Sequence, residues 1–541
     1  MPGFHVPRPA NEPVRAYEPG SAERAALESR LAEMSKQRIE APLVIGGKEV
    51  RSGDTFTFRA PHCHDLELAD VHAARAEDIT AAILASKAAH HDWSRWDPTE
   101  RAGVFLRAAD LVAGPWRDTI NAATMLGQSK SVHQSEIEAA CELVDFLRFN
   151  AAFAEQLRDM QPYSPEGMWN RMEYRPLEGF VLAISPFNFT AIACNLPTAP
   201  ALMGNTVVWK PSEKQALAAH YTMAALRAAG LPDGVINLVH GDGALAADVC
   251  TADPDFAGLH FTGSAQVLRG LWRTVGERID TYRSFPRIVG ESGGKDFVVA
   301  HPSAQVDPLV VALGRGAFEY QGQKCSAASR AYIPRSAWPE VRDGVADLAR
   351  EANQSMGDVG DLSTFMGAVI DGSAFAKHRD AIEAARASGV EVLAGGGTDD
   401  SVGWFVEPTV LVTDDPQYDT MERELFGPVL SVYVYDDDDD WEDALDLVDE
   451  TGPYALTGSI FAEDRRAVHE GLDRLRDAAG NIYVNDKPTG SVVGQQPFGG
   501  ARGSGTNDKA GSLLNIVRWT SARAIKELFA PPTDWRYPHM G

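Results

Sequence analysis

The chain has 541 residues, enough for two or three domains with sizeable cores. Its formal net charge of −26 disfavours binding to nucleic acid or to an anionic membrane surface. Five scattered cysteines without a CxxC pair indicate a reducing compartment, and residues 1–18 resemble neither a signal peptide nor a transit peptide. No run approaches the ~18 apolar residues of a membrane span. We therefore expect a cytoplasmic protein that acts on small molecules.

The first third of the chain is predicted to be mainly helical. Residues 1–40 form an extended arm followed by a charged helix from Ala22 to Gln37, and Pro42 to Lys48 has the pattern of a β-hairpin. The spacing of apolar residues predicts further helices at Val71 to Trp96, Glu100 to Ala113 and Ser135 to Leu157. Pro162 to Glu178, which mixes proline, glycine and alternating polar and apolar residues, is expected to leave the main body.

From Gly179 onward, short apolar strands alternate with helices. Strands are predicted at 180–184, 206–210, 235–239 and 258–262. A second alternating series runs from Asp296 to Phe461. This alternation predicts an α/β fold with parallel, doubly wound sheets, in which ligands bind at the carboxyl ends of the strands.

The segment Gln321-Gly322-Gln323-Lys324-Cys325-Ser326 holds a candidate nucleophile. A thiol reacts as its thiolate, and we expect the neighbouring Lys324 to lower the pKa of Cys325. An apolar helix predicted from Leu309 to Phe318 leads into the segment and would present the thiol rigidly. Taken alone, however, a single cysteine is more often a small buried apolar residue than a nucleophile.

Two polar segments follow the first two predicted strands. In Ser185-Pro186-Phe187-Asn188-Phe189, the amide of Asn188 can donate to a developing oxyanion, or it can simply form an Asx turn. In Lys210-Pro211-Ser212-Glu213, an ammonium and a carboxylate can bind ribose hydroxyls, or they can cap a helix. Both segments lie where parallel sheets bind ligands, so we treat them as candidate site segments.

Two small-residue turns lie further along. Phe261-Thr262-Gly263-Ser264 opens a helix whose amides can face a pyrophosphate. Gly290-Glu291-Ser292-Gly293-Gly294-Lys295 carries a carboxylate that can act as a general base. No metal site is expected, because the aspartates at 436–440 have the pattern of a solvated loop or helix start and His62-Cys63-His64 lacks a partner pair.

Together with Glu424-Leu425-Phe426-Gly427-Pro428, these segments, in this order, resemble the aldehyde dehydrogenase superfamily over nearly the whole chain. Further stretches are similar to the branch of that superfamily that oxidises L-glutamate γ-semialdehyde, the second step of proline catabolism: Leu177–Phe180, Gly322–Ser326, Gly494–Arg502 and Ser504–Lys509. Two rival functions stay open. One is oxidation of another semialdehyde, such as succinate or aminoadipate semialdehyde, and the other is a catalytically silent homologue.

The resemblance implies a division of the chain. Residues 1–161 and 179–295 would form a Rossmann-type NAD-binding domain, and 296–484 an α/β catalytic domain. A β-flap for oligomerisation would combine 162–178 with 511–541, while 485–510 would form the substrate anchor loop and return to the cofactor domain. The expected assembly is a homodimer or a higher homo-oligomer, possibly a hexamer.

The resemblance also implies roles for single residues. Cys325 would attack the aldehyde, the Asn188 side chain and the Cys325 amide would hold the oxyanion, and Glu291 would activate water to hydrolyse the thioester. The cofactor, NAD, would bind eleven residues: Ser185, Pro186, Phe187, Lys210, Ser212, Glu213, Gly263, Ser264, Gly293, Glu424 and Phe426.

For the substrate, the resemblance implies a site for each end of the molecule. Gly490 and Ser491, helped by Ser326, would hold the α-carboxylate, and Glu142 would lie near the α-ammonium unless it is an ordinary solvated helix carboxylate. The remaining expected substrate contacts are Phe189 and Phe498, around the aliphatic chain, and Lys324.

Overall fold

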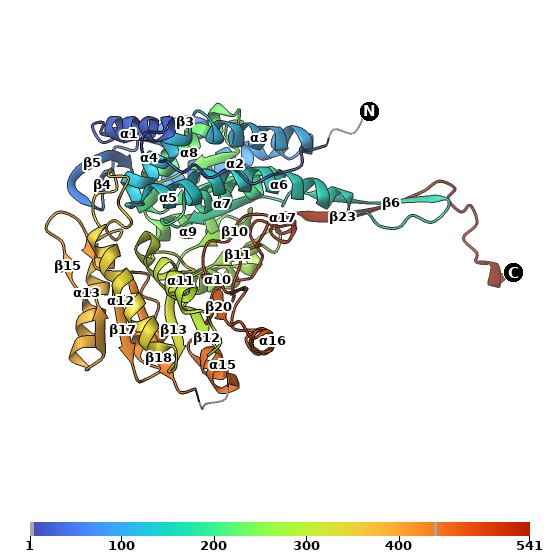
Figure 1. Ribbon diagram of the computed structural model, residues 1–541. Helices are drawn as coiled ribbons and strands as arrows, with labels where there is room; N and C mark the ends of the chain where they lie inside the picture. The colour runs from blue at the N-terminus through green and yellow to red at the C-terminus, as the bar shows by residue number, and fades with distance from the viewer. Residues whose placement is uncertain (1–4, 438–440) are drawn as a thin grey trace.

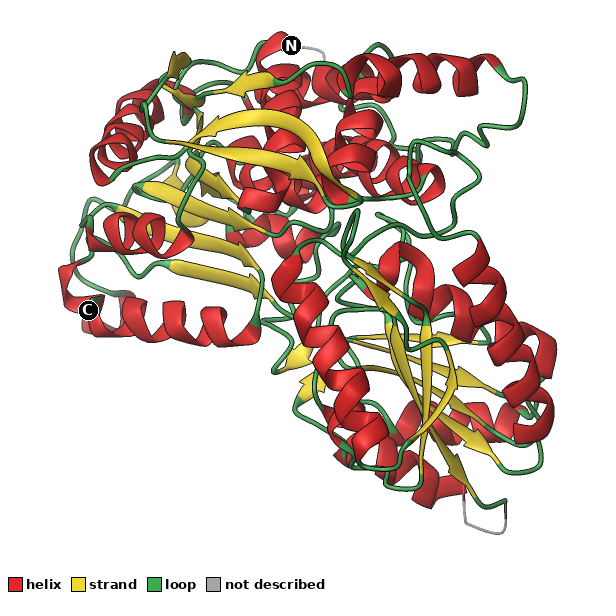
Figure 2. Cartoon of the chain, turned by 90° about the vertical axis from the view of Figure 1, so that its left-hand side faces the viewer, coloured by secondary structure: helices red, strands yellow, loops and turns green. Residues whose placement is uncertain are grey.

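The computed structural model describes residues 5–437 and 441–541, and two seven-stranded sheets surrounded by helices dominate it (Figures 1 and 2). In the first sheet, five parallel strands continue into an antiparallel hairpin, β2–β3. Its spatial order is β11 (Arg287–Glu291), β10 (Phe256–Thr262), β7 (Phe180–Ser185), β8 (Thr206–Pro211), β9 (Ile236–Leu238), β2 (Leu43–Ile45) and β3 (Lys48–Val50).

The second sheet is parallel except for the edge strand β14. Its spatial order is β14 (Glu391–Ala394), β17 (Thr409–Thr413), β18 (Val429–Tyr435), β13 (Ala328–Pro334), β12 (Asp296–Ala300), β20 (Thr457–Phe461) and β21 (Asn481–Val484). Every residue of β12 and β20 is buried, which is why neither strand shows an alternating pattern; after Asp296, β12 is continuously apolar.

Helices occupy the connections. Those in the part of the chain that builds the first sheet are α1 (Ala22–Met34), α2 (Ala76–Trp93), α3 (Pro98–Ala113), α4 (Arg117–Gln128), α5 (Val132–Ser135), η1 (Glu136–Cys141), α6 (Glu142–Asp159), α7 (Thr190–Leu202), η2 (Glu213–Gln215), α8 (Ala216–Ala228), α9 (Gly243–Ala252), α10 (Ala265–Glu277) and η3 (Ile279–Thr281). Those that follow β11 are α11 (Val306–Phe318), η4 (Glu319–Gly322), α12 (Trp338–Gln354), α13 (Gly372–Ala387), α14 (Asp419–Glu422), α15 (Trp441–Glu450), α16 (Arg465–Arg474), α17 (Leu513–Arg518) and η5 (Pro538–Met540).

The remaining strands form small sheets. They are the three-stranded β1 (Ile39–Ala41), β5 (Cys63–His72) and β4 (Thr55–Ala60), the pairs β15 (Thr398–Asp399) with β16 (Phe405–Val406) and β19 (Tyr454–Ala455) with β22 (Ala501–Arg502), and the ribbon β6 (Met168–Arg175) with β23 (Ser521–Leu528). Figure 1 shows the β6–β23 ribbon projecting from the body, with the C-terminus beyond it. In this ribbon Ser521 pairs with Arg175 and Leu528 with Met168, so segments far apart in the sequence form one antiparallel arm.

The predicted fold class, α/β with parallel doubly wound sheets, is confirmed. One predicted boundary is wrong: the chain at Val71 is still in strand β5, and helix α2 begins at Ala76. The acidic first turn of α2 sets that start, because the Asp78 carboxylate accepts a hydrogen bond from the Arg75 N–H at 2.9 Å. Of the aspartates at 436–440, residues 438–440 lie outside the described part. Within residues 5–437 and 441–541, no helix is long and apolar enough to cross a membrane.

Candidate active site

Cys325 lies in a turn between α11 and β13 that unusual backbone geometry holds in place. Tyr320 and Gln321, directly after α11, are buried and left-handed, with φ of 50° and 55°. Such conformations are costly for residues other than glycine and persist where neighbouring groups enforce them. Here Gln321 Nε2 donates to Ser129 O at 2.9 Å and to Ala368 O at 2.7 Å. The segment is therefore fixed to two other parts of the chain immediately before the thiol.

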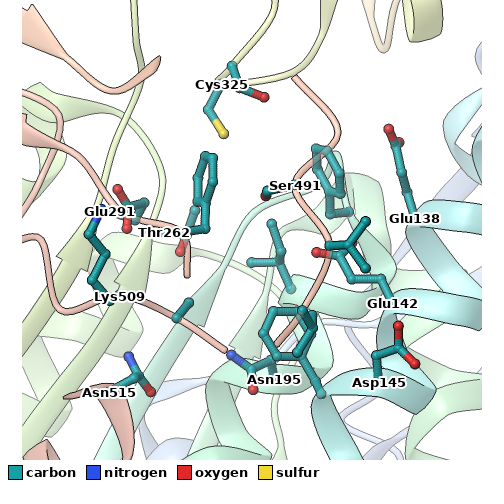
Figure 3. Close-up of a pocket in the computed structure, with 18 of the residues that line it drawn as sticks. Glu138, Glu142, Asp145, Asn195, Thr262, Glu291, Cys325, Ser491, Lys509 and Asn515 are labelled. Atoms are coloured by element: carbon teal, nitrogen blue, oxygen red, sulfur yellow. The ribbon is translucent and has the colours of Figure 1, made fainter. Parts of the chain in front are cut away.

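A cavity of about 390 Å³ contains the Cys325 thiol. Figure 3 shows the thiol pointing into the cavity, with Glu291 on one side and Glu142 on the other. Asp145 lies on the Glu142 side, below Glu142 in the same view. The cavity thus brings together a nucleophile, a candidate base and a cluster of helix carboxylates.

The expectation that Lys324 lowers the pKa of Cys325 is wrong. Burial, together with the carboxylates of Asp296 and Glu291, raises the pKa of the thiol well above its usual value. Lys324 points away from the cavity, and its Nζ lies 2.6 Å from Glu138 Oε1. Its charge is therefore neutralised locally, and the resting protein holds Cys325 as a thiol.

The ammonium of Lys324 belongs to a buried network of charges. Glu138 also pairs with Lys130 Nζ at 2.5 Å, and Glu319 accepts from Lys324 at 3.3 Å and from Lys487 at 2.7 Å. Burial would raise the pKa of Glu319, but the two ammonium groups outweigh it and lower that pKa to about 2. The network is closely paired, which buried charges require. It gives Lys324 a structural position behind the cavity instead of the predicted direct contact with substrate.

Glu291 lies at the carboxyl end of β11, as its glycine-rich segment predicts. Its Oε1 accepts a hydrogen bond from the Gly500 N–H at 2.8 Å. Burial raises the pKa of Glu291 to about 8, although the Gly500 amide and the Lys509 ammonium oppose the shift. A carboxyl group with a pKa near neutrality can both take and return a proton, which is what a general base needs.

Asn188 is buried beside the nucleophile. Its Nδ2 donates to the carbonyl of Gln323 at 3.1 Å, two residues before Cys325. A side-chain amide carries two N–H groups, so this bond leaves a second donor. The contact holds Asn188 at the turn that carries the thiol, where an oxyanion donor has to lie.

The candidate cofactor residues gather at the carboxyl ends of β7, β8 and β10. Ser264 caps α10 and accepts from the Val267 N–H at 3.3 Å, so the first-turn amides of this thirteen-residue helix can face a pyrophosphate. The Ser185 hydroxyl accepts from Trp209 Nε1 at 2.9 Å, and Ser212 caps η2. The Ser185 carbonyl also accepts from the Ser212 N–H at 2.9 Å, so the turns after β7 and β8 are held against each other.

Two charged residues of the β8 turn fit a dinucleotide. Burial lowers the pKa of Lys210, against the attraction of Glu213 and Asp242. In the described part of the chain Lys210 forms no ion pair, so a buried ammonium remains for ribose or phosphate oxygens. Glu213 is exposed on η2, within reach of a ligand that enters from solvent. The residues present therefore fit NAD.

A second group of candidate cofactor residues lies against Glu424. The Gly294 N–H donates to Glu424 Oε1 at 3.1 Å, and a Cβ added to Gly293 would lie 2.0 Å from Glu424 Oε2. A larger residue at 293 would displace the Glu424 carboxylate. Phe426 is left-handed, with φ of 55°, and its ring meets the Phe187 ring edge-on at 5.8 Å. This strained aromatic pair and the carboxylate form one wall, as the resemblance implies for the nicotinamide side.

The other side of the cavity carries three carboxylates of η1 and α6: Glu138, Glu142 and Asp145. The first is neutralised by two lysines, and the last accepts from Asn11 Nδ2 at 2.8 Å and from the Glu12 N–H at 2.7 Å. Glu142, between them, forms no hydrogen bond or ion pair within the described residues. Burial and the neighbouring Glu138 raise its pKa well above its usual value. Glu142 therefore faces the cavity, and its place near the α-ammonium stays a prediction.

The other predicted substrate residues line the same cavity: Phe189, Ser326, Gly490, Ser491 and Phe498. Ser326 Oγ lies 2.8 Å from Thr489 Oγ1, which ties the nucleophile's neighbour to the 489–493 loop. Phe189 is packed on its far side by Lys130 Nζ, 4.4 Å from the ring centroid. An apolar wall of aromatic rings and a polar loop thus lie side by side.

Several lining residues were missed from the sequence. The spacing of Glu138, Glu142 and Asp145 along one helix face would have suggested the carboxylate cluster. No comparable signal exists for Asn11, Glu12 and Val14 of the N-terminal arm, which line the cavity from more than a hundred residues away in the sequence.

The fold and the site define a class of protein: the chain belongs to the aldehyde dehydrogenase family, whose model matches residues 49–525. Within this family, its full-length relatives include Δ1-pyrroline-5-carboxylate dehydrogenases. The mitochondrial enzyme of Bos taurus is 49% identical over 533 residues, which cover 98% of this chain and 94% of the relative. That of Dictyostelium discoideum is 48% identical and covers 99% of this chain and 96% of the relative.

Solved structures agree with this grouping. The NAD-bound Δ1-pyrroline-5-carboxylate dehydrogenase from Mycobacterium tuberculosis is 57% identical, covers 100% of both chains and superposes with a TM-score of 0.96. The 1-pyrroline-5-carboxylate dehydrogenase from Thermus, also with bound NAD, is 27% identical, with a TM-score of 0.89 over 97% of this chain and 100% of that one.

Proposed function

We propose that the chain is an NAD-dependent dehydrogenase that oxidises L-glutamate γ-semialdehyde, the hydrolysed form of Δ1-pyrroline-5-carboxylate, to L-glutamate in proline degradation. The observation that carries this proposal is the cavity in which the Cys325 thiol and the Glu291 carboxylate share one space with the unpaired Glu142. An aldehyde can react at one end of this space while a cation is held at the other. The full-length similarity to enzymes of this name supports the same substrate.

In the first half of the reaction, Cys325 Sγ adds to the aldehyde carbon. The Asn188 amide and the Cys325 N–H stabilise the oxygen that becomes negative. The thiol proton passes to solvent as the carbon–sulfur bond forms, so the Glu291 carboxylate stays free to act as the base in the second half. When bound, NAD supplies a cationic ring that accepts the hydride, and this leaves a thioester on Cys325.

In the second half, Glu291 takes a proton from water, and the resulting hydroxyl attacks the thioester carbonyl. The C–S bond breaks, glutamate leaves, and the Cys325 sulfur regains its proton. Asn188 again holds the oxygen, because hydrolysis passes through a second oxyanion. Cys325 and Asn188 thus serve both halves of the reaction, and Glu291 serves the hydrolysis.

The remote end of the substrate carries two opposite charges, which a buried site has to pair. Glu142 faces the α-ammonium, and the backbone amides of Gly490 and Ser491, with the Ser326 and Ser491 hydroxyls, face the α-carboxylate. Phe189 and Phe498 enclose the aliphatic chain. A neutral aldehyde would leave these polar groups without partners, and sites of this kind reject such analogues strongly.

The proposal is tested by measuring NADH formation at a fixed low concentration of three aldehydes: L-glutamate γ-semialdehyde, succinate semialdehyde and hexanal. The glutamate derivative should have the highest kcat/KM by at least about 100-fold, since a site built for charged groups discriminates by far more than a methylene contact does. Equal kcat/KM for hexanal or succinate semialdehyde would refute the substrate while leaving an aldehyde dehydrogenase. Absence of activity with all three would favour a silent homologue.

Replacement of Glu142 with glutamine should raise KM for L-glutamate γ-semialdehyde by about 10- to 100-fold, the usual effect of losing a hydrogen bond to a charged group. The substitution keeps the shape of the side chain and removes the charge that pairs with the ammonium. Steady-state kinetics with hexanal provide the comparison, because hexanal has no ammonium. A KM increase of the same size for both aldehydes would assign Glu142 a packing role only.

Glu213 predicts the choice of cofactor. A carboxylate at the adenine ribose accepts bonds from the ribose hydroxyls and repels a 2′-phosphate. The wild type should therefore use NAD with a higher kcat/KM than NADP, and Glu213→Ser should shift the ratio toward NADP by about tenfold or more, as removal of one charge repulsion allows. Kinetics with both dinucleotides measure this, with Lys214→Ser on the same exposed turn as the control. An unchanged ratio would place Glu213 outside the ribose site.

The assembly and the compartment are also proposed. An isolated two-stranded ribbon is marginally stable, yet β6 and β23 extend from the body and expose Trp169, with Phe529 and Trp535 exposed just beyond β23. This supports at least a homodimer that covers the ribbon. The five cysteines form no disulfide, which supports a cytoplasmic, reducing environment. Light scattering of the purified protein measures its oligomeric state.

A further inference from the structure

The N-terminal arm, the described residues 5–18, lies along the helical segment that carries the carboxylate cluster. The Val6 N–H donates to Glu155 at 3.1 Å, the Glu12 N–H to Asp145 at 2.7 Å, and the Arg15 N–H to Glu136 at 2.8 Å. Residues later in the arm thus contact residues earlier in α6 and η1. The arm is therefore an ordered, antiparallel neighbour of this helix; Figure 1 shows it in dark blue, between the N label and α1.

Buried charges anchor the arm at its centre. Glu12 Oε1 accepts from Arg117 Nη1 at 2.6 Å, and Glu12 Oε2 accepts from Arg148 Nη1 at 2.7 Å. Tyr17 is buried with a left-handed φ of 50°, and its hydroxyl donates to Glu136 Oε2 at 2.9 Å. A strained residue kept in place by a buried hydrogen bond marks a position that the surrounding structure determines.

Asn11 joins three parts of the site. Its Nδ2 donates to Asp145 Oδ2 at 2.8 Å and to the Val493 carbonyl at 2.8 Å, while its Oδ1 accepts from Gln495 Nε2 at 3.0 Å. One side chain thus connects α6 to the loop that begins at Gly490. All of its polar groups are used, so its orientation is fixed.

The arm also forms part of the cavity wall. Asn11, Glu12 and Val14 line the space that contains Cys325, and so do Ser491 and Val493 of the loop. The loop residues proposed to hold the α-carboxylate therefore lie only a few residues from the backbone group that Asn11 fixes. In the proposed substrate site, arm, helix and loop converge on the end remote from the thiol.

We propose that the N-terminal arm is part of the substrate site, and that Asn11 is a positioning residue that fixes the 490–495 loop against α6 and so confers the preference for aldehydes with a charged remote end. This inference rests on the proposed function, because it explains how that site obtains its selectivity. Asn11 acts through the loop and through Asp145, and it takes no part in the transfer of hydride or protons.

Three hydrogen bonds depend on this one side chain, and the loss of two of them has a consequence at the site. Without Asn11, the Val493 carbonyl loses its hydrogen-bond donor and the loop becomes more mobile. Binding of the α-carboxylate then has to order the loop, and the lost conformational entropy weakens substrate binding. Asp145 loses one of the hydrogen bonds that oppose the rise of its pKa to about 6. The thiol, Asn188 and Glu291 make no hydrogen bond with the arm residues that the structure describes, and they keep their geometry.

The test is the kinetics of Asn11→Ala in the full chain with two aldehydes. KM for L-glutamate γ-semialdehyde should rise about tenfold, and kcat should stay within about twofold, since the one hydrogen bond that fixes the loop, from Asn11 to the Val493 carbonyl, is worth about a factor of ten. KM for hexanal and KM for NAD should not change. A general loss of structure would instead lower kcat for both aldehydes, so the KM-against-kcat split separates positioning from folding.

Further variants test the result more closely. Asn11→Asp keeps the shape but sets a carboxylate against Asp145 and the Val493 carbonyl, so it should raise KM more than Asn11→Ala does. Gln495→Ala should add little to Asn11→Ala in the double variant, because both act on one hydrogen-bonded unit. His5→Ala, on the same arm but paired with Glu155 away from the cavity, is the matched control and should behave as wild type.

The outcomes separate the two proposals. If the wild type oxidises L-glutamate γ-semialdehyde well and Asn11→Ala leaves its KM unchanged, the role of the arm is refuted and the proposed function stands. If the wild type does not prefer this aldehyde over hexanal, the proposed function is refuted, and the role of the arm in that preference is refuted with it. An equal rise of KM for both aldehydes in Asn11→Ala would also overturn the inference, since the arm would then shape the cavity without contributing selectivity.

Discussion

Replacement of Cys325 with alanine is expected to abolish NADH formation while NAD still binds. The nucleophile forms the bond through which both halves of the reaction pass, so its loss should lower kcat by at least about 10⁴-fold, as removal of a nucleophile typically does. Absorbance at 340 nm measures turnover, and calorimetric titration with NAD measures binding. The binding constant should change little, since the predicted cofactor residues are held by β7, β8 and α10.

The control for this experiment is Cys63→Ala. Cys63 begins β5 and does not line the cavity around Cys325, so its loss should leave turnover unchanged. Substantial turnover by folded Cys325→Ala would mean that another group attacks the aldehyde. Loss of turnover in both variants would instead point to general oxidation or misfolding of the preparation.

Replacement of Glu291 with glutamine is expected to give one rapid burst of NADH followed by turnover slowed by about 10²–10⁴-fold. Glutamine keeps the hydrogen bond from Gly500 but cannot take a proton from water, so the thioester should accumulate. Stopped-flow absorbance at 340 nm records the burst and the steady rate. Steady turnover equal to wild type would exclude Glu291 as the base.

The pH dependence of the wild type provides an independent check on Glu291. Its pKa lies at about 8, above the usual value, so the carboxylate fraction increases as pH rises through about 8. Thioester hydrolysis should therefore accelerate with rising pH and level off above about 8. In Glu291→Gln this slope should vanish, because the titrating group is gone. A slope retained in the variant would assign the profile to another group, such as Glu424, whose pKa lies at about 7.

The sequence predicted the fold well because its signals are local. The strands around β7 and β8 are continuous apolar runs, and such runs are typical of buried parallel strands. Helix starts were less accurate: helical spacing extends back to Val71, but pairing with β4 keeps residues up to His72 in a strand. Strand pairing is a tertiary effect, and it overrides the local pattern.

The sequence predicted which residues lie close together in the candidate site better than it predicted their charges and pKa values. Cys325, Glu291 and Asn188 lie together, as their motifs suggested. The adjacency of Lys324 to Cys325 in sequence suggested an activated thiolate. The lysine side chain instead turns to Glu138, whose position depends on packing between η1 and the turn after α11. The residues around Cys325 give no sequence signal for the direction in which the Lys324 side chain turns.

The contribution of the arm could not be predicted for a similar reason. Asn11 and Val493 are separated by 482 residues, and only the folded chain brings them within hydrogen-bonding distance. The composition of the arm, rich in proline and charge, is that of an ordinary extended terminus. Its order comes from Arg117, Glu136 and Asp145, which belong to helices elsewhere.

The Cys325 sulfur is expected to carry the acyl group of the substrate during turnover. Glu291→Gln should be mixed with NAD and L-glutamate γ-semialdehyde, quenched in acid after the burst, digested, and examined by peptide mass spectrometry. We expect the peptide that contains Cys325 to gain one γ-glutamyl group, in an amount equal to the NADH of the burst. A burst of NADH with Cys325 unmodified, or with the group on another residue, would contradict the mechanism.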